Sequence, residues 1–152
     1  MAEPKAPQGD ADLSDMLQEL RVLQQGAQVL TAFLVILPFT EAFEQLGPVQ
    51  HWVFLATFLS SLASLVFLSA PAANHRLQRP VTDKEGFKAT ATRTILIGVA
   101  FESLAWVLVA DLVVSAVFDG PISLVAAGLT ALLVLALWWL MPLLSRRARG
   151  QR

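Results

Sequence analysis

Two acidic residues stand in one of the most apolar stretches of the sequence, "LIGVAFESLAWVLVADLVVSAVF", residues 96–118. A carboxylate in hydrocarbon is energetically costly unless it is paired or hydrated, so such residues are candidates for carrying protons or ions. Glu102 and Asp111 are nine residues apart, which on an α-helix places them about 13 Å apart along the axis and on opposite sides. They therefore predict two separate positions, not one two-carboxylate site.

Glu102 is expected to lie deeper in the membrane than Asp111. Side chains at the same depth on the other helices are the ones that could hydrogen-bond to its carboxyl group. Counting from Arg21 and from Arg93 places Gln28 and Thr31 near its depth, and Ser64 and Ser103 complete the expected cluster. The candidate proton or ion site is therefore Glu102 with Gln28, Thr31 and Ser64. The secondary candidates are Asp111, Glu41, Arg21, His75 and Arg76.

This cluster has two readings. Hydrogen-bond donors favour the ionised carboxylate, whereas removal from water favours the neutral acid. When the two effects are similar in size, the acid can take up and release a proton, as a proton-coupled carrier requires. Polar side chains also hold membrane helices together, at about 0.6 to 2 kcal/mol each. A protonated Glu102 bonded to Gln28 would be such a tie. The sequence leaves both readings open.

The elements that must position these residues are apolar helices. Hydrophobic residues make up 55% of the 152-residue chain and charged residues only 15%, whereas globular domains are about 25% charged. A membrane-spanning helix needs about 20 predominantly apolar residues. Stretches 22–40, 51–70, 94–118 and 121–144 meet this requirement. The sequence predicts an all-α integral membrane protein with four transmembrane helices.

The basic residues set the orientation. In a four-span arrangement all 11 Lys and Arg fall on one side: before the first span, in the loop of residues 71–93, and in the tail of residues 145–152. Positively charged loops stay in the cytoplasm. Both termini are therefore expected to be cytoplasmic.

The segments outside the spans divide by composition. Residues 1–10 resemble a disordered tail, and residues 11–24 form an amphipathic pattern that leads into the first span or docks a partner. Residues 145–152 are a basic tail. Small residues recur at four-residue spacing within two spans, which predicts close helix approach inside the monomer or in a dimer. These residues are Ala56, Ser60 and Ser64, and Ala127 and Ala131 near Gly128.

Several classes of function lack their motifs. The sequence has no phosphate-binding glycine loop, zinc-protease motif, nucleophile elbow or dinucleotide fingerprint. Cysteine is absent, and the expected topology places His51 and His75 on opposite faces of the membrane. With a net charge of −1 there is no overall basic field for nucleic acid. We expect no enzymatic activity, no cofactor, no metal site and no nucleic-acid partner.

Three segments resemble a known family: "MLQELRV", "QVLTAFLVILPFTEAF" and "SAPAANHR". The chain is similar, over most of residues 13–144, to a domain-of-unknown-function family of small actinobacterial membrane proteins. The resemblance is most specific at Glu19–Arg21, Gln28, Pro38–Phe39, Ala70–Pro71 and His75–Arg76. It implies a four-span fold in a bacterial plasma membrane, and some members carry the label sodium:proton antiporter. The third span lies outside these motifs, so the resemblance supports Arg21, Gln28, His75 and Arg76 but not Glu102 or Asp111.

The sequence favours a non-enzymatic structural, accessory or interaction protein of the lipid bilayer. Four short helices leave little room for a pore, so we expect a homo-oligomer or a subunit of a larger membrane complex. The alternative is a small proton- or cation-coupled transporter that uses the intramembrane carboxylate of Glu102.

Overall fold

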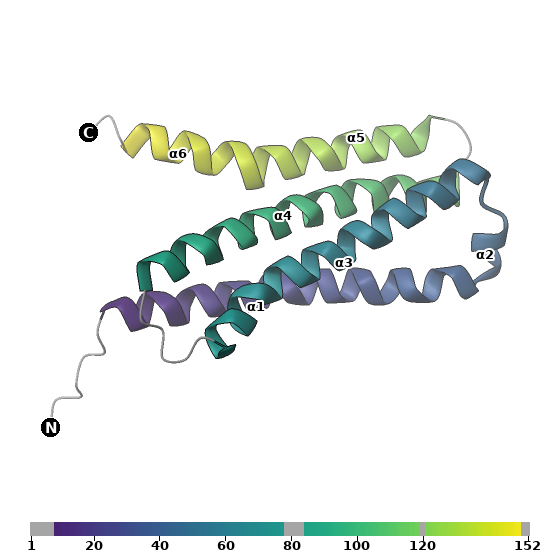
Figure 1. Ribbon diagram of the computed structural model, residues 1–152. Helices are drawn as coiled ribbons and strands as arrows, with labels where there is room; N and C mark the ends of the chain where they lie inside the picture. The colour runs from purple at the N-terminus through teal and green to yellow at the C-terminus, as the bar shows by residue number, and fades with distance from the viewer. Residues whose placement is uncertain (1–7, 78–83, 119–120, 150–152) are drawn as a thin grey trace, which may run out of the picture.

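The computed structural model describes residues 8–77, 84–118 and 121–149, and nearly all of these residues are helical. The helices are long and lie side by side, each reversing the direction of the one before (Figure 1). The prediction of an all-α protein is confirmed.

The chain begins with α1 (Gln8–Ile36), the 3-10 turn η1 (Leu37–Phe39) and the one-turn helix α2 (Glu41–Glu44), followed by α3 (Pro48–Leu77) and α4 (Lys84–Ser115). The last part is a continuous rod of α5 (Ile122–Val134), the π-helical segment η2 (Leu135–Leu140) and α6 (Met141–Arg149). Pro38 stands in η1, where the missing N–H of proline helps to end α1. Pro48 opens α3, because the first helical position needs no N–H donor.

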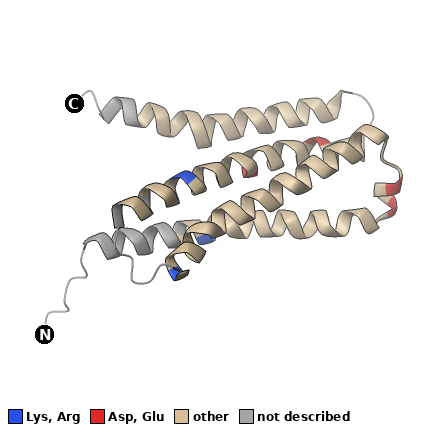
Figure 2. Ribbon diagram, in the orientation of Figure 1, with Lys and Arg blue, Asp and Glu red and all other residues tan. Residues whose placement is uncertain are grey.

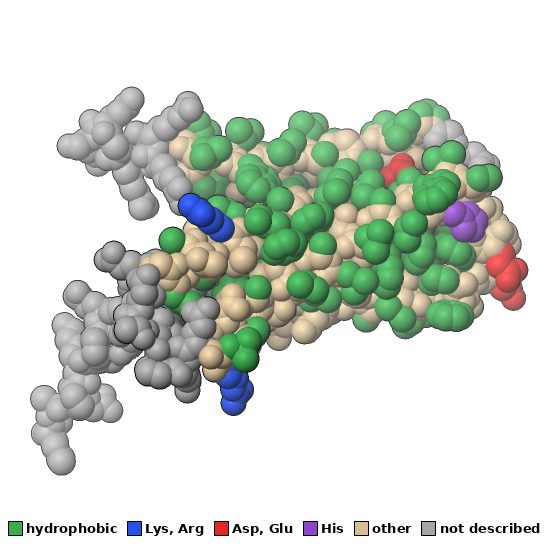
Figure 3. All heavy atoms as spheres, viewed as in Figure 1, with side chains coloured by type: hydrophobic (Ala, Val, Ile, Leu, Met, Phe, Trp, Pro, Cys, Tyr) green, Lys and Arg blue, Asp and Glu red, His purple; other side chains and the backbone are tan. Residues whose placement is uncertain are grey.

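Four helical segments are long and apolar enough to cross a membrane, as the sequence predicts. They are Leu20–Phe39, Pro48–Leu77, Ala89–Ser115 and Ile122–Ser145, with 20, 30, 27 and 24 residues. Each reaches the length of about 20 residues that the hydrocarbon core requires. Large apolar side chains cover much of the surface drawn in Figure 3, as expected where lipid is the solvent.

Two of the helices run further than the expected spans. Residues 71–93 are expected to form a loop, but α3 continues to Leu77 and α4 already begins at Lys84. Pro71 lies inside α3 and is buried, so packing holds the helix together although proline removes one backbone hydrogen bond. Hydropathy predicts where a helix leaves the hydrocarbon, but it does not predict where the helix ends. Residues with high helix propensity, such as Ala, Lys and Arg, allow a helix to continue beyond the membrane boundary.

Among the described residues of the N-terminal end, the structure differs from expectation only at residues 8–10, which are expected in a disordered tail but are the first residues of α1. Residues 11–24, predicted to be a helix that leads into the first span, are helical and continuous with that span. The rest of that tail, residues 1–7, lies outside the described residues. The basic tail is helical as far as Arg149, and its last three residues also lie outside the described part.

Among the described helices, the interface between α3 and α4 is the most extensive, followed by those of α5 with α4 and of α1 with α3. The face that α3 buries is made mainly of small side chains: Thr57, Ser60, Ser61, Ser64, Leu68 and Pro71. Small residues let two helix backbones approach closely. At Gly98 of α4 the approach is so close that a Cβ atom would lie 2.9 Å from Leu68 Cγ and 3.2 Å from the Leu68 backbone nitrogen.

An apolar core joins α1 to α4. Leu30 and Leu34 of α1 pack with Ala105, Val109 and Leu112 of α4, and partly buried side chains of α3 lie against them. Five such side chains, at most 8% exposed, exclude water from this half of the bundle.

Charge lies mainly at the two ends of the molecule. The start of α1 and the end of α6 are at the same end (Figure 1), and the described Lys and Arg residues lie in the parts of the helices nearer to it (Figure 2). We call this the basic end; it holds Arg21, Arg76 and Arg93. The opposite end carries Glu41 and Glu44 of α2 and is called the acidic end.

Candidate functional site

Glu102 lies on the face of α4 that packs against α3, and it is only 3% exposed. Both of its carboxyl oxygens are fully shielded and make no hydrogen bond with any described residue. A buried polar group without a partner loses its interactions with water and gains nothing in return. Glu102 is therefore the most unfavourably placed polar side chain that the structure describes.

Ser64 of α3 and Trp106 of α4 are the donors close enough to interact with the Glu102 carboxyl. Ser64 is completely buried, and its hydroxyl, like the carboxyl, completes no hydrogen bond of good geometry among the described residues. Trp106 is one turn along α4 from Glu102, so their side chains are helical neighbours. The site is thus a carboxyl, a hydroxyl and an indole edge held close together but not bonded.

Thr31 and Ser61 form a second polar contact, between α1 and α3. The Thr31 hydroxyl donates to the Ala27 carbonyl oxygen at 2.8 Å, and its oxygen lies 2.5 Å from Ser61 Oγ. A hydroxyl has one proton, so Ser61 donates to Thr31. Both hydroxyl protons of this pair are already in hydrogen bonds, so neither hydroxyl can donate to Glu102.

Gln28 is exposed on α1, and the bond to Glu102 that a structural tie would use is not formed. Ser103 is also engaged elsewhere. Its hydroxyl donates to the Val99 carbonyl oxygen at 2.8 Å and accepts a hydrogen bond from Trp139 Nε1 at 3.3 Å. Of the four residues proposed for the site, the structure therefore brings Ser64 beside Glu102, sets Thr31 in a neighbouring pair and leaves Gln28 outside.

The bond from Trp139 links the π-helical segment η2 to the residue that follows Glu102. A π-helical turn is wider than an α-helical turn and occurs frequently at functional sites. The fourth span thus contacts α4 at the level of the buried carboxyl.

Apolar packing closes the site on both sides. Toward the acidic end lie Ala105, Val109 and Leu112, each on the buried face of α4. Toward the basic end, one turn away, Gly98 is pressed against Leu68. In this conformation water reaches Glu102 from neither end of the bundle.

The secondary candidates do not join this site. Asp111 is half-buried, with one carboxyl oxygen shielded and without a partner among the described residues, but it lies off the face that holds Glu102. Glu41 is exposed at the acidic end, and Arg21 and Arg76 are exposed at the basic end. His75 packs edge-on against Phe87 with ring centroids 5.8 Å apart.

Sequence reasoning did not select Trp106, Ser61 or Gly98. Trp106 could have been found from its spacing of four residues from Glu102, and Ser61 is adjacent to the small-residue pattern of α3. Within the described ranges, no group of three His, Asp or Glu residues could hold a metal ion.

Four helices long and apolar enough to span a membrane, with a buried carboxyl on α4 beside α3, are typical of a small, all-helical membrane protein. A family model described as "Family of unknown function (DUF6328)" matches residues 2–142, and the chain belongs to this family. The match includes nearly all of the four spans, so the expected membership of a family of unknown function is confirmed. Neither the curated proteins nor the solved structures give a significant match to the chain.

Proposed function

We propose that this protein is a non-enzymatic proton- or cation-coupled carrier of the bacterial plasma membrane, in which Glu102 binds the coupling ion. The observation that carries the proposal is the burial of both Glu102 oxygens without a hydrogen-bond partner among the described residues. A carboxyl that only holds helices together makes hydrogen bonds to them. The structural role that the sequence favours is weakened because the bond to Gln28 is absent.

The energetics of a buried carboxyl supply a reason for coupling. Glu102 is tolerated in an apolar interior when it is neutralised by a proton or by a bound cation, whereas the bare carboxylate is strongly disfavoured. One ion therefore leaves readily only when another replaces it. Ser64 adds a hydroxyl oxygen that can accept from the protonated acid or contribute to a cation site.

Exchange at this position requires the helices to separate, because apolar packing closes both sides of Glu102. The contact of Leu68 with Gly98 and the core around Val109 are the two closures that would have to open in turn. The observed arrangement corresponds to an occluded state of the proposed cycle.

The test is a vesicle assay on the full chain. Purified protein is reconstituted into acid-loaded liposomes that contain a pH-sensitive dye, and Na⁺ or K⁺ is added outside. We expect the wild type to release protons at least tenfold faster than Glu102→Gln, which keeps the shape of the side chain but cannot ionise. Asp111→Asn, a matched change in the same helix, should retain most of the rate.

Equal rates for the wild type and Glu102→Gln would exclude Glu102 as the coupling site. Rates no higher than those of protein-free liposomes, with both ions, would reject the carrier function itself.

The second candidate is the structural, accessory or interaction role, and one observation favours it. The most apolar window of the fourth span is 0% buried in the monomer, and Gly128 has open space where a side chain would be. Such a surface suits close packing with a second copy or with another membrane protein. This role would be supported if Gly128→Leu abolished a chemically cross-linked dimer or complex but left the Glu102-dependent rate of proton release unchanged.

We propose the orientation that the basic residues favour, with both termini in the cytoplasm. It is supported by the position of the described Lys and Arg residues, which lie nearer to the end where α1 begins and α6 ends (Figures 1 and 2).

A further inference from the structure

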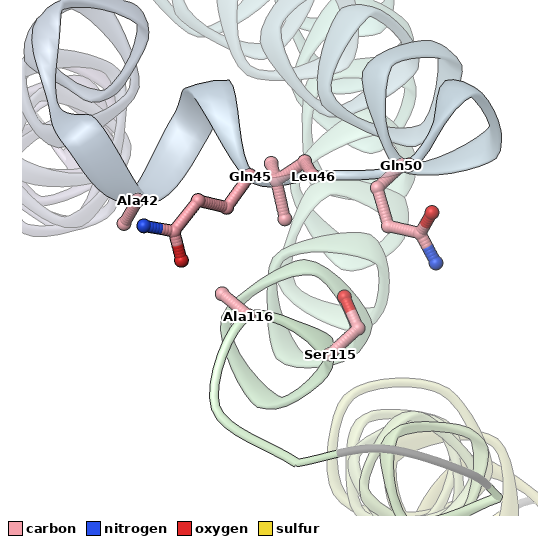
Figure 4. A pocket seen from close by; sticks show the side chains of 7 residues that line it. Ala42, Gln45, Leu46, Gln50, Ser115 and Ala116 are labelled. Atoms are coloured by element: carbon pink, nitrogen blue, oxygen red, sulfur yellow. The ribbon is translucent and has the colours of Figure 1, made fainter.

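Two neighbouring cavities lie at the acidic end, far along α4 from Glu102. The larger has a volume of about 360 Å³ and a mainly polar lining. Figure 4 shows Gln45, from the connection between α1 and α3, and Gln50, from the first turn of α3, on one side and Ser115 at the end of α4 on the other. This volume is in the range of about 300 to 1,000 Å³ that is usual for small-ligand sites.

The smaller cavity has a volume of about 130 Å³ and an entirely apolar lining. Ala42, Leu46 and Ala116 line both cavities, so the polar pocket and the apolar slot are adjacent. The slot is bordered by Phe33 of α1 and by Val117, in the turn that follows α4, which are 43% and 72% exposed on the outside of the bundle. It therefore opens toward the region that lipid chains would occupy.

The chemistry of the polar pocket selects an uncharged ligand rich in hydrogen-bonding groups. The amides of Gln45 and Gln50 supply both donors and acceptors. The Ser115 hydroxyl donates to the Leu112 carbonyl oxygen at 3.0 Å, which leaves its oxygen free to accept. The described lining residues carry no charge, and Glu41 and Glu44, which flank Ala42 and Gln45 in the sequence, are acidic and exposed.

An anionic phosphate would be repelled by these two carboxylates and would find no cation among the described lining residues. A sugar hydroxyl group is uncharged, so it can donate hydrogen bonds to the amides and accept hydrogen bonds from them without this repulsion. The adjacent slot adds a requirement for an apolar chain attached to the polar group. Both requirements are met together by one class of molecule, a lipid with a sugar head group.

We propose that this composite site binds a single uncharged glycolipid, such as a monoglycosyl diacylglycerol, from the membrane leaflet at the acidic end. The sugar occupies the pocket between Gln45, Gln50 and Ser115, at the level where α4 ends. One acyl chain follows the slot beside Phe33 and Val117. The bound lipid fixes the α1–α3 connection to α4.

The test uses the full chain in a detergent without a sugar head group. Monoglucosyl diacylglycerol, phosphatidylglycerol and phosphatidylcholine with the same acyl chains are added in equal amounts, and the retained lipid is counted by native mass spectrometry. We expect the glycolipid to be retained at least fivefold more than either phospholipid. Free glucose at the same concentration should not displace it, since the acyl chain contributes to binding.

Ala116→Leu fills the boundary between pocket and slot and should abolish the preference. Ala100→Leu is the matched control, an exposed alanine within α4 that lines neither cavity, and it should bind as the wild type does. Equal retention of the three lipids, preference for a phospholipid, or an unchanged preference in Ala116→Leu would each overturn the proposal. Displacement by free glucose at that concentration would show that the sugar alone determines binding, and would overturn the role of the slot in holding an acyl chain.

Discussion

Leu68 of α3 rests directly on Gly98 of α4, and a Cβ atom at Gly98 would lie 2.9 Å from Leu68 Cγ. Four residues further along each helix, in opposite directions, Ser64 and Glu102 come together. The close approach at Gly98 therefore sets the register and the spacing at which the hydroxyl and the carboxyl meet. A site deep in the bundle depends on a residue that has no side chain.

Gly98→Ala should destabilise the protein by about 1 to 3 kcal/mol, because the added methyl group overpacks a tight interface that includes backbone. The matched control is Gly128→Ala, since nothing lies within 4 Å of a Cβ at that position and alanine favours the helix. Denaturation of the purified protein in mild detergent measures the difference. Equal loss in the two variants would contradict the role of Gly98 in packing.

Two buried serines of α3 should respond differently to removal of the hydroxyl. Ser61→Ala loses the bond to Thr31 and should destabilise by about 1 kcal/mol, the usual net value of such a bond. Ser64→Ala removes a hydroxyl without a partner among the described residues and should leave stability unchanged or slightly higher. The same denaturation curves compare them, and a larger loss for Ser64→Ala would show that its hydroxyl is bonded.

The sequence predicts the four spans because their length and apolar character follow directly from the thickness of the hydrocarbon. It predicts less well where the helices end, since packing carries α3 through the buried Pro71 and the polar residues before Leu77 are compatible with a helix that continues into water. The one-turn helix α2 and the π-helical segment η2 depend on local packing that apolar composition does not encode.

Glu102 can be selected from the sequence because a carboxyl in an apolar stretch stands out, and counting residues gives its depth and that of Ser64. Counting does not give the rotation of a helix about its axis. That rotation places Ala27 and Thr31 inside the bundle and leaves Gln28 exposed. It is set by the fit of Leu30 and Leu34 into the core, which only the assembled structure reveals.

Glu102→Leu should make the protein more stable, by about 1 to 3 kcal/mol, because it removes an unpartnered buried carboxyl and keeps the volume of the side chain. Variants that lack a functional side chain are often more stable than the wild type, because such side chains are placed for function and not for stability. The control is Glu44→Leu, an exposed acid of α2, which should leave the denaturation midpoint nearly unchanged. A less stable Glu102→Leu would indicate that the carboxyl has a partner in the native membrane protein.

The orientation can be tested cleanly because the chain has no cysteine. Glu44→Cys places a thiol on α2 at the acidic end, and Leu77→Cys places one at the end of α3, at the basic end; both positions are exposed. We expect a membrane-impermeant maleimide to label Glu44→Cys in intact cells and Leu77→Cys only after permeabilisation, since the basic end faces the cytoplasm. Labelling of both thiols in intact cells would mean that the segment between them does not cross the membrane. The reverse pattern would keep the four spans but invert the protein, and the glycolipid pocket would then face the inner leaflet.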